Sequence, residues 1–162
     1  MPEAVDPAVP FAVVEPLLAW SETELRDLPW RQTRNPWKIL VSEIMLQQTQ
    51  VSRVIDRWHE FLDRFPTATA CADAPTSAVI ELWAGLGYNR RAVNLWRAAV
   101  EVRDLHDGAL PTTVEGLQSL PGVGPYTARA VAAFAYELDV GVVDPDVGRL
   151  LARWTGTTLS SK

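Results

Sequence analysis

The chain has 162 residues, of which 48% are hydrophobic and 22% charged, a composition typical of one globular domain with a buried core. No stretch approaches the roughly 18 apolar residues of a membrane span, and the start Met1-Pro2-Glu3 lacks the basic region of a secretory signal. We therefore expect a cytoplasmic protein. Its single cysteine, Cys71, excludes a disulfide framework and a Cys-rich metal site within these residues.

The formal net charge of −5 is unevenly distributed. Residues 1–27 hold six of the 20 acidic residues and one of the 15 basic ones, so residues 28–162 are neutral overall. A nucleic-acid-binding protein normally has a basic surface. Because the acidity is confined to the N-terminal end, the total charge does not exclude a nucleic-acid partner.

Apolar residues recur at helical spacing along most of the chain, and no run alternates as a half-buried strand would. Residues 1–10, with three prolines, are expected to form a loose tail. Helices are predicted at 14–25, 37–46, 51–65, 67–73, 76–84, 90–105, 126–136 and 147–154, with a short one after Thr112 or Thr113 as its cap. Pro145 suits the first turn of the last helix. The sequence therefore predicts an all-α protein of about eight to ten helices.

The segment Leu120-Pro-Gly-Val-Gly-Pro-Tyr-Thr-Ala128 lies between two predicted helices. Gly122 and Gly124 allow a sharp turn and place backbone N–H groups at the start of the next helix. Such a turn is an anion site suited to a DNA phosphate, and it needs no basic side chain. From spacing alone, an ordinary helix–helix turn explains the segment equally well.

Two carboxylates could support acid–base chemistry. Glu43 lies in an apolar helical run, where burial would raise its pKa and suit a general acid. The more common alternative is a glutamate that faces water or pairs with an arginine. Asp144 precedes Pro145 and is either an ordinary helix N-cap or a carboxylate at the mouth of a cleft. Together they form the kind of pair that cleaves glycosidic bonds.

Four motifs, in this order and spacing, resemble those of adenine DNA glycosylases of the MutY type: Glu43-Ile-Met-Leu-Gln-Gln-Thr49, Gly85-Leu-Gly-Tyr88, the 120–128 segment and Val143-Asp144. These enzymes belong, with endonuclease III, to the helix-hairpin-helix DNA glycosylase superfamily, and the resemblance runs from about Leu28 to Trp154. It implies an acidic tail and first helix at 1–27, and a six-helix barrel at 28–140 with the helix-hairpin-helix at about 113–137. The start of a second helical domain would occupy 141–162.

The resemblance also implies an activity: hydrolysis of the N-glycosidic bond of adenine mispaired with 8-oxoguanine or guanine. Glu43 matches the acid that protonates adenine N7, and Asp144 matches the carboxylate that stabilises the oxocarbenium ion. Tyr126 matches a residue that supports both carboxylates, at a position where lyase members have a nucleophilic lysine. A monofunctional glycosylase without lyase activity follows.

The implied partner is double-stranded DNA with mismatched or oxidised base pairs, bound by a monomer at the bacterial nucleoid and not at a membrane. Gln48 and Tyr88 match residues that enter the duplex beside the lesion while adenine is flipped out. Phosphate contacts are predicted for Gly122, Gly124 and Thr127, and base-pocket contacts for Trp30 and Arg31. Three arginines on one predicted helix either contact phosphates or face water: Arg90, Arg91 and Arg97.

The chain departs from the family pattern in three ways. The cysteine quartet for a four-iron, four-sulfur cluster and the domain that recognises 8-oxoguanine lie C-terminal to residue 162 in full-length relatives. We therefore expect a partial chain that holds no cluster and no other metal, and whose first and last helices lack partners. After Asp144, Asp146 replaces an amide and Gly148 a cation, so a surface facing DNA becomes more negative.

Two rival functions remain open. A G:T or G:U mismatch glycosylase shares the hairpin, the tyrosine and the aspartate, although Glu43 favours adenine because a purine gains from protonation at N7. A non-catalytic DNA-binding fragment is favoured by Asp146 and the neutral body. The presence of Glu43, Tyr126 and Asp144 together argues against it.

Overall fold

The computed structural model describes residues 8–156, which form α-helices and one short 3-10 helix, with no strand among them. The described chain divides into two compact units. One spans residues 28–142, and the other combines 8–27 with 143–156. No helix within 8–156 is long and apolar enough to cross a membrane.

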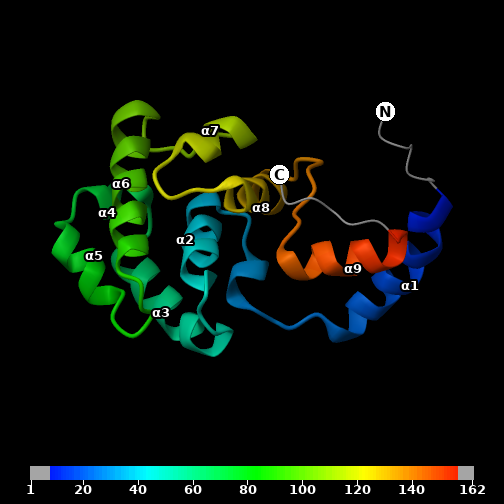
Figure 1. Ribbon diagram of the computed structural model, residues 1–162. Coiled ribbons are helices and arrows are strands. Elements are labelled where there is room, and N and C mark those ends of the chain that lie inside the picture. The colour runs from blue at the N-terminus through cyan, green and yellow to red at the C-terminus, as the bar shows by residue number, and fades with distance from the viewer. Residues whose placement is uncertain (1–7, 157–162) are drawn as a thin grey trace. The chain divides into compact units, whose positions relative to one another are not determined.

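The unit at 28–142 is built around helix α2 (Pro36–Leu46), which Figure 1 shows between α8 on one side and α3 and α6 on the other. Asn35 caps α2 by accepting a hydrogen bond from the Lys38 N–H, and Pro36 occupies its first turn. Seven of its eleven residues are buried: Trp37, Ile39, Leu40, Val41, Ser42, Ile44 and Met45. The apolar run at 37–46 is therefore the centre of the core.

The remaining helices of this unit are α3 (Val51–Arg64), α4 (Ala68–Ala72), α5 (Thr76–Leu82), α6 (Arg90–Leu105), α7 (Val114–Ser119) and α8 (Pro125–Tyr136), with the 3-10 helix η1 at Pro29–Gln32. The predicted helices between residues 37 and 136 are confirmed, and Thr113 is the cap of α7. Indole N–H groups join elements of the unit: Trp37 donates to the Phe65 carbonyl and Trp58 donates to the Lys38 carbonyl.

The second unit consists of α1 (Ala8–Glu24) and α9 (Pro145–Thr155), which pack against each other. The prediction of a loose tail over 1–10 is wrong for residues 8–10, because Pro10 stands in the first turn of α1, where a missing N–H is tolerated; residues 1–7 lie outside the described chain. The expectation that the first and last helices lack partners is also corrected, since each partners the other. Large apolar side chains nevertheless stay exposed on α1, among them Leu18 and Trp20.

Candidate active site and nucleic-acid interface

Glu43 lies in the last turns of α2, between the buried residues Ser42 and Ile44. It is half-buried, and burial raises the pKa of its carboxyl to about 7. Within residues 8–156 no arginine or lysine forms an ion pair with it. The common alternative of an arginine-paired glutamate therefore does not apply, and Glu43 has the environment of a group that is partly protonated at neutral pH.

The predicted hairpin joins α7 to α8, with Leu120 and Val123 buried and a hydrogen bond of 3.1 Å from the Val123 N–H to the Leu120 carbonyl. Gly122 has a φ of +78°, and a Cβ added there would lie 2.6 Å from the Cβ of Asn94 on α6. Both its left-handed backbone and this close approach require glycine at position 122. The turn is therefore shaped by packing against α6.

The start of α8 has the backbone groups of an anion site. The first intrahelical bond runs from the Ala128 N–H to the carbonyl of Gly124, the N-cap, so Gly124 and Thr127 have no intrahelical partner for their N–H groups. A Cβ on Gly124 would meet no atom within 4 Å, so open space lies beside this backbone. A phosphate could approach here without displacing a side chain.

The side chain of Thr127, which we expected to contact DNA, is 3% exposed and accepts a hydrogen bond of 3.3 Å from Gln47 Nε2. The buried hydroxyl joins the end of α2 to the start of α8 and is not available to a phosphate. Only the backbone N–H of Thr127 remains a candidate contact. Tyr126, the preceding residue, is half-exposed in the first turn of α8.

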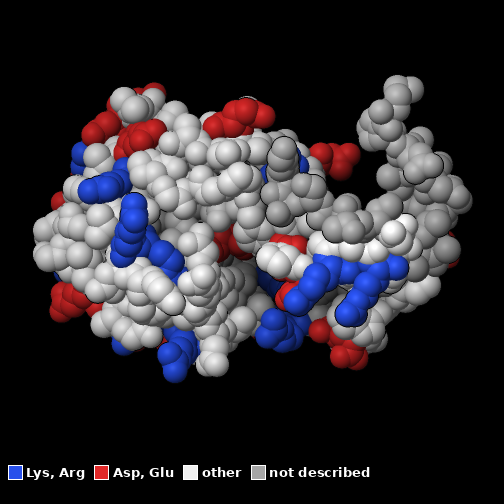
Figure 2. Space-filling model, in the orientation of Figure 1, with Lys and Arg blue, Asp and Glu red and all other residues white. Residues whose placement is uncertain are grey.

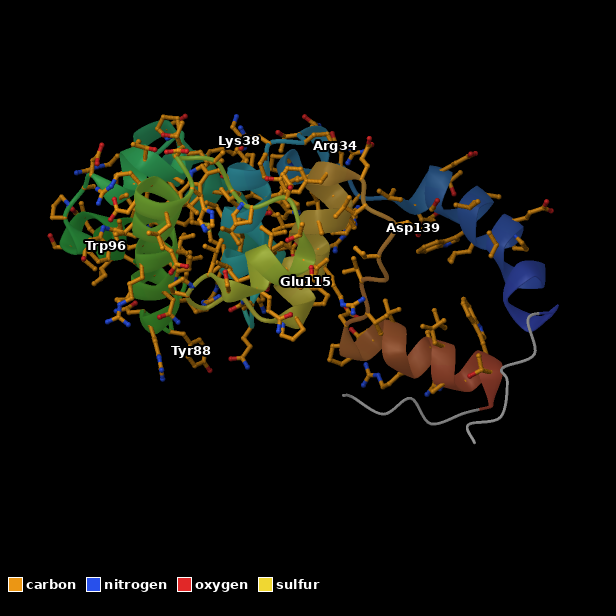
Figure 3. All side chains as sticks on the ribbon, turned by 90° about the horizontal axis from the view of Figure 1, so that it is seen from above. Arg34, Lys38, Tyr88, Trp96, Glu115 and Asp139 are labelled. Atoms are coloured by element: carbon orange, nitrogen blue, oxygen red, sulfur yellow. The ribbon has the colours of Figure 1, made fainter. Side chains whose placement is uncertain are left out.

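Gln48 and Tyr88 lie on two loops, one directly after α2 and the other directly before α6. Both side chains are exposed, Tyr88 by 68%, and Figure 3 shows Tyr88 beyond the N-terminal end of α6, directed away from the helix. Both residues have a left-handed backbone, with φ of +54° for Gln48 and +50° for Tyr88. Such conformations are uncommon for residues other than glycine and are concentrated at functional sites.

Arg91 explains how these two loops are held. The sequence left it as a phosphate contact or a solvated side chain, but its guanidinium is half-buried and bonded to carbonyls of both loops, those of Gln47 and Leu86. Arg90 and Arg97, on the same helix, are exposed as expected. No local signal in the sequence separates Arg91 from these two, because the carbonyls that it binds belong to residues at least 40 positions earlier as well as to near neighbours.

Asp144 belongs to the other unit and is the N-cap of α9, where its Oδ1 accepts a hydrogen bond of 2.7 Å from the Val147 N–H. The capping interpretation is confirmed, and it orients the carboxylate without neutralising it. Asp146, expected to add negative charge, forms an ion pair with Arg149 one turn later. Figure 2 shows basic side chains along α9 as well as over α6.

Trp30 and Arg31, the predicted base-pocket residues, lie on η1. Trp30 is buried and packs edge-to-face on Trp58, with ring centroids 6.1 Å apart, whereas Arg31 is exposed. Their part in a base pocket stays a prediction.

An iron–sulfur cluster of the family type needs four thiolates. The sequence holds one cysteine, and burial raises the pKa of the Cys71 thiol to about 12, which keeps it protonated. Residues 8–156 also contain no group of three or more His, Cys, Asp or Glu side chains placed to hold a metal ion. The residues present do not fit such a cluster, and no step of the chemistry is assigned to one.

Comparisons with known proteins agree with this geometry. A family model for HhH-GPD superfamily base excision DNA repair proteins matches residues 41–162. An adenine DNA glycosylase of Mycobacterium tuberculosis (strain CDC 1551 / Oshkosh) is 50% identical over 138 residues, which are 85% of this chain and 45% of that protein. A thermostable thymine-DNA glycosylase structure matches with a TM-score of 0.84 and 30% identity, covering 89% of this chain and 67% of that one. An endonuclease III–DNA complex shares the fold at 21% identity, with a TM-score of 0.73 over 86% of this chain and 65% of that one.

The chain spans about half the length of the curated relatives that it matches. The matched region nevertheless includes Glu43, the hairpin and Asp144. The chain therefore belongs to the HhH-GPD superfamily of base excision DNA repair proteins.

Proposed function

We propose that this protein is a DNA N-glycosylase that releases adenine mispaired with 8-oxoguanine or guanine. The observation that carries the proposal is Glu43, a half-buried carboxyl without a cationic partner in the described chain, whose pKa burial raises to about 7. A general acid works best when its pKa lies near the working pH. Ordinary surface glutamates do not reach this range.

Protonated Glu43 would donate its proton to N7 of adenine. The C1′–N9 bond then breaks, and the base leaves as a neutral species with the bonding electrons. Asp144, oriented by the N-cap bond to Val147, would stabilise the positive charge on the sugar until water attacks C1′. In this mechanism Glu43 acts as the acid, a role that its burial supports.

The proposed reaction is hydrolysis without strand cleavage. A β-lyase step needs an amine that forms a Schiff base with C1′. The sequence has two lysines, of which Lys38 is in the first turn of α2, and Lys162 lies outside the described residues. Tyr126 stands where lyase members of the family have their lysine, and a phenol cannot form a Schiff base.

Duplex DNA would be bound at two places. The Gly124 and Thr127 N–H groups at the start of α8 suit a phosphate, which requires no basic side chain in a chain that is neutral over residues 28–162. Gln48 and Tyr88 would enter the base stack, where the aromatic ring replaces lost stacking and the amide bonds the orphaned partner base.

A second candidate is removal of thymine or uracil opposite guanine, because a thymine-DNA glycosylase structure is similar to this chain over 89% of its length. The two functions differ in their need for an acid. Thymine has no N7, so a protonated glutamate gives its departure no corresponding advantage. The raised pKa of Glu43 and the 50% identity to an adenine DNA glycosylase favour adenine.

The test is single-turnover release from duplexes that contain A:8-oxoguanine, A:G, T:G or U:G pairs, developed with and without alkali. We expect cleavage at adenine alone, only after alkali, and lost in Glu43→Gln and Asp144→Asn. A duplex with 7-deazaadenine, which has carbon in place of N7, should bind and stay intact. Release of thymine would establish the second candidate. A folded chain that binds every duplex and releases no base would be a non-catalytic binding module.

A further inference from the structure

Arg91, the second residue of α6, places its guanidinium between the end of α2 and the turn that precedes α6. Nη1 donates to the carbonyls of Ile44 at 2.9 Å, Met45 at 3.0 Å and Gln47. Nη2 donates to Thr49 Oγ1 at 2.9 Å, to the Leu86 carbonyl at 2.9 Å and to the Gly87 carbonyl at 3.1 Å. One side chain thus shares its four terminal N–H bonds among six acceptors, two in the last turn of α2 and four on the two loops.

These acceptors surround the two exposed side chains of the interface. Gln47 and Thr49 flank Gln48, and Gly87 directly precedes Tyr88. The guanidinium carbon also lies 5.7 Å from the centroid of the Tyr88 ring, within cation–π range. Arg91 therefore contacts the immediate backbone neighbours of Gln48 and both the backbone neighbour and the ring of Tyr88.

Both residues have the left-handed backbone described above, which neither side chain favours by itself. Strained conformations persist only where the surroundings determine them. Around Gln48, the Thr49 N–H donates to Leu46 and the Thr49 hydroxyl contacts the Gln47 carbonyl at 3.2 Å, and the guanidinium binds this same group of atoms. Backbone and hydroxyl groups of both loops thus bind Arg91, while the side chains of Gln48 and Tyr88 remain exposed.

We propose that Arg91 is a positioning residue that holds Gln48 and Tyr88 at a fixed separation and direction, so that both enter the DNA duplex as one rigid wedge. This inference rests on the proposed function of the two side chains in DNA. It assigns Arg91 no contact with the base or with phosphate, because both of its terminal nitrogens are bonded within the protein.

Arginine suits this role because its planar fork reaches several carbonyls at fixed angles, whereas the ammonium of lysine is a point donor on a flexible chain. Its positive charge also lies at the C-terminal end of α2, where the free carbonyls make a cation favourable. The substitution Arg91→Lys keeps the charge and removes the fork. It therefore separates positioning from simple electrostatic attraction to DNA.

The experiment measures insertion directly. A duplex carries an A:G pair with fluorescent 2-aminopurine as the neighbouring base, and the chain carries Glu43→Gln so that no base is released. Entry of the wedge unstacks the reporter and raises its fluorescence. We expect Arg91→Lys to reduce this rise by about fivefold, with affinity for a fully paired duplex changed less than about twofold, because the proposed phosphate contacts at α8 are untouched.

Arg103→Lys is the matched control, since Arg103 lies near the other end of α6 and bonds Asp73 and Asp104. It should leave the fluorescence rise unchanged. Should Arg91→Lys fail to fold by circular dichroism, Thr49→Val removes one Nη2 acceptor at nearly constant volume and should give a smaller loss in the same direction. If a folded Arg91→Lys chain gives the same rise in 2-aminopurine fluorescence as the chain with Arg91, the inference is overturned. The same holds for Thr49→Val where that variant is used in place of Arg91→Lys.

A double-variant cycle distinguishes positioning from general destabilisation. The cycle uses chains with Glu43 intact. Where Gln48 and Tyr88 are both present, Arg91→Lys should slow adenine release by about tenfold. Where both are replaced by alanine, the same substitution should slow release by less than about twofold. Equal factors in both backgrounds would show that Arg91 does not act through the wedge. If the unaltered chain unstacks the reporter but releases no adenine, the proposed function fails and the fluorescence comparison still decides the role of Arg91. A chain that never unstacks the reporter overturns the inference itself.

Discussion

The two carboxylates of the proposed reaction, Glu43 and Asp144, lie in regions that are built in different ways. Glu43 belongs to the unit at 28–142, whose helices all contribute buried residues to one core. Asp144 belongs to the unit of α1 and α9, in which α9 buries none of its residues and none of residues 14–24 is buried. Packing therefore sets the pKa of the Glu43 carboxyl, whereas a single local hydrogen bond sets the orientation of the Asp144 carboxylate.

This difference determines how each group can be altered. The protonation of Glu43 depends on the burial of its carboxyl in the packed unit, which raises its pKa to about 7. The direction of Asp144 depends on the Val147 N–H at 2.7 Å. A substitution that removes the Glu43 carboxyl should therefore slow adenine release and raise the free energy of unfolding. At Asp144, one substitution can remove the charge and keep the cap, whereas another removes both.

The largest expected effect is on the rate of adenine release. Glu43→Gln keeps the size of the side chain and removes the transferable proton, so release should slow by about 10³-fold, within the usual range for a general acid. In the unaltered chain the rate should fall about tenfold per pH unit above a pH of about 7, because the acid loses its proton. Single-turnover rates between pH 5 and 9 test both expectations. A rate that rises through pH 7 would contradict the role of Glu43 as an acid.

The second effect is on stability, with the sign set by the raised pKa. Below pH 4.5 the carboxyl is protonated in both folded and unfolded chains; above about 7 it is ionised in both, and the folded state bears the cost of the buried charge. Stability should therefore fall as pH rises between these values, by about 2–3 kcal/mol. Urea unfolding at pH 5 and pH 8 should show this loss in the unaltered chain. The Glu43→Gln chain should lack it and be the more stable of the two at pH 8.

The contrast between the regions also explains what could be predicted of the fold. Helices in the packed unit follow from apolar spacing and, for α7, from the cap at Thr113, because the core enforces what the local pattern indicates. The first helix begins at Ala8, six residues before its predicted start, because prolines near that start are also typical of a loose tail. None of residues 14–24 of α1 is buried, so little tertiary packing reinforces its apolar pattern, and the start of this helix is harder to predict than those of the packed unit.

The candidate site was predictable where its chemistry is local. The N-cap role of Asp144, the position of the turn at Gly122 and the apolar run around Glu43 can each be recognised from the nearest residues of the chain. Two features depend on contacts between distant segments and were not predicted. The burial of the Thr127 hydroxyl needs Gln47, 80 residues away, and the guanidinium of Arg91 needs α2.

Steric packing of the hairpin gives the third prediction. Gly122→Ala places a Cβ 2.6 Å from Asn94 on a left-handed backbone and should destabilise the chain by about 2–3 kcal/mol. Gly124→Ala is the matched control: it has an ordinary φ of −84° and open space around the new methyl, so stability should change by less than about 0.5 kcal/mol. Urea unfolding separates the two variants. If Gly124→Ala also weakens duplex binding in a stable protein, the open space beside it is where a phosphate approaches.

The smallest effect on stability concerns the cap of α9. Asp144→Ala removes the acceptor of the Val147 N–H and should destabilise the start of α9 by about 1 kcal/mol, whereas Asp144→Asn retains an oxygen that can cap. Hydrogen exchange at residues 145–149 should accelerate in the alanine variant alone. Both variants should lose adenine release, because neither carries the negative charge that opposes the oxocarbenium ion. An active asparagine variant would instead show that Asp144 serves only to begin α9, and the ionised partner of Glu43 would then have to be another group.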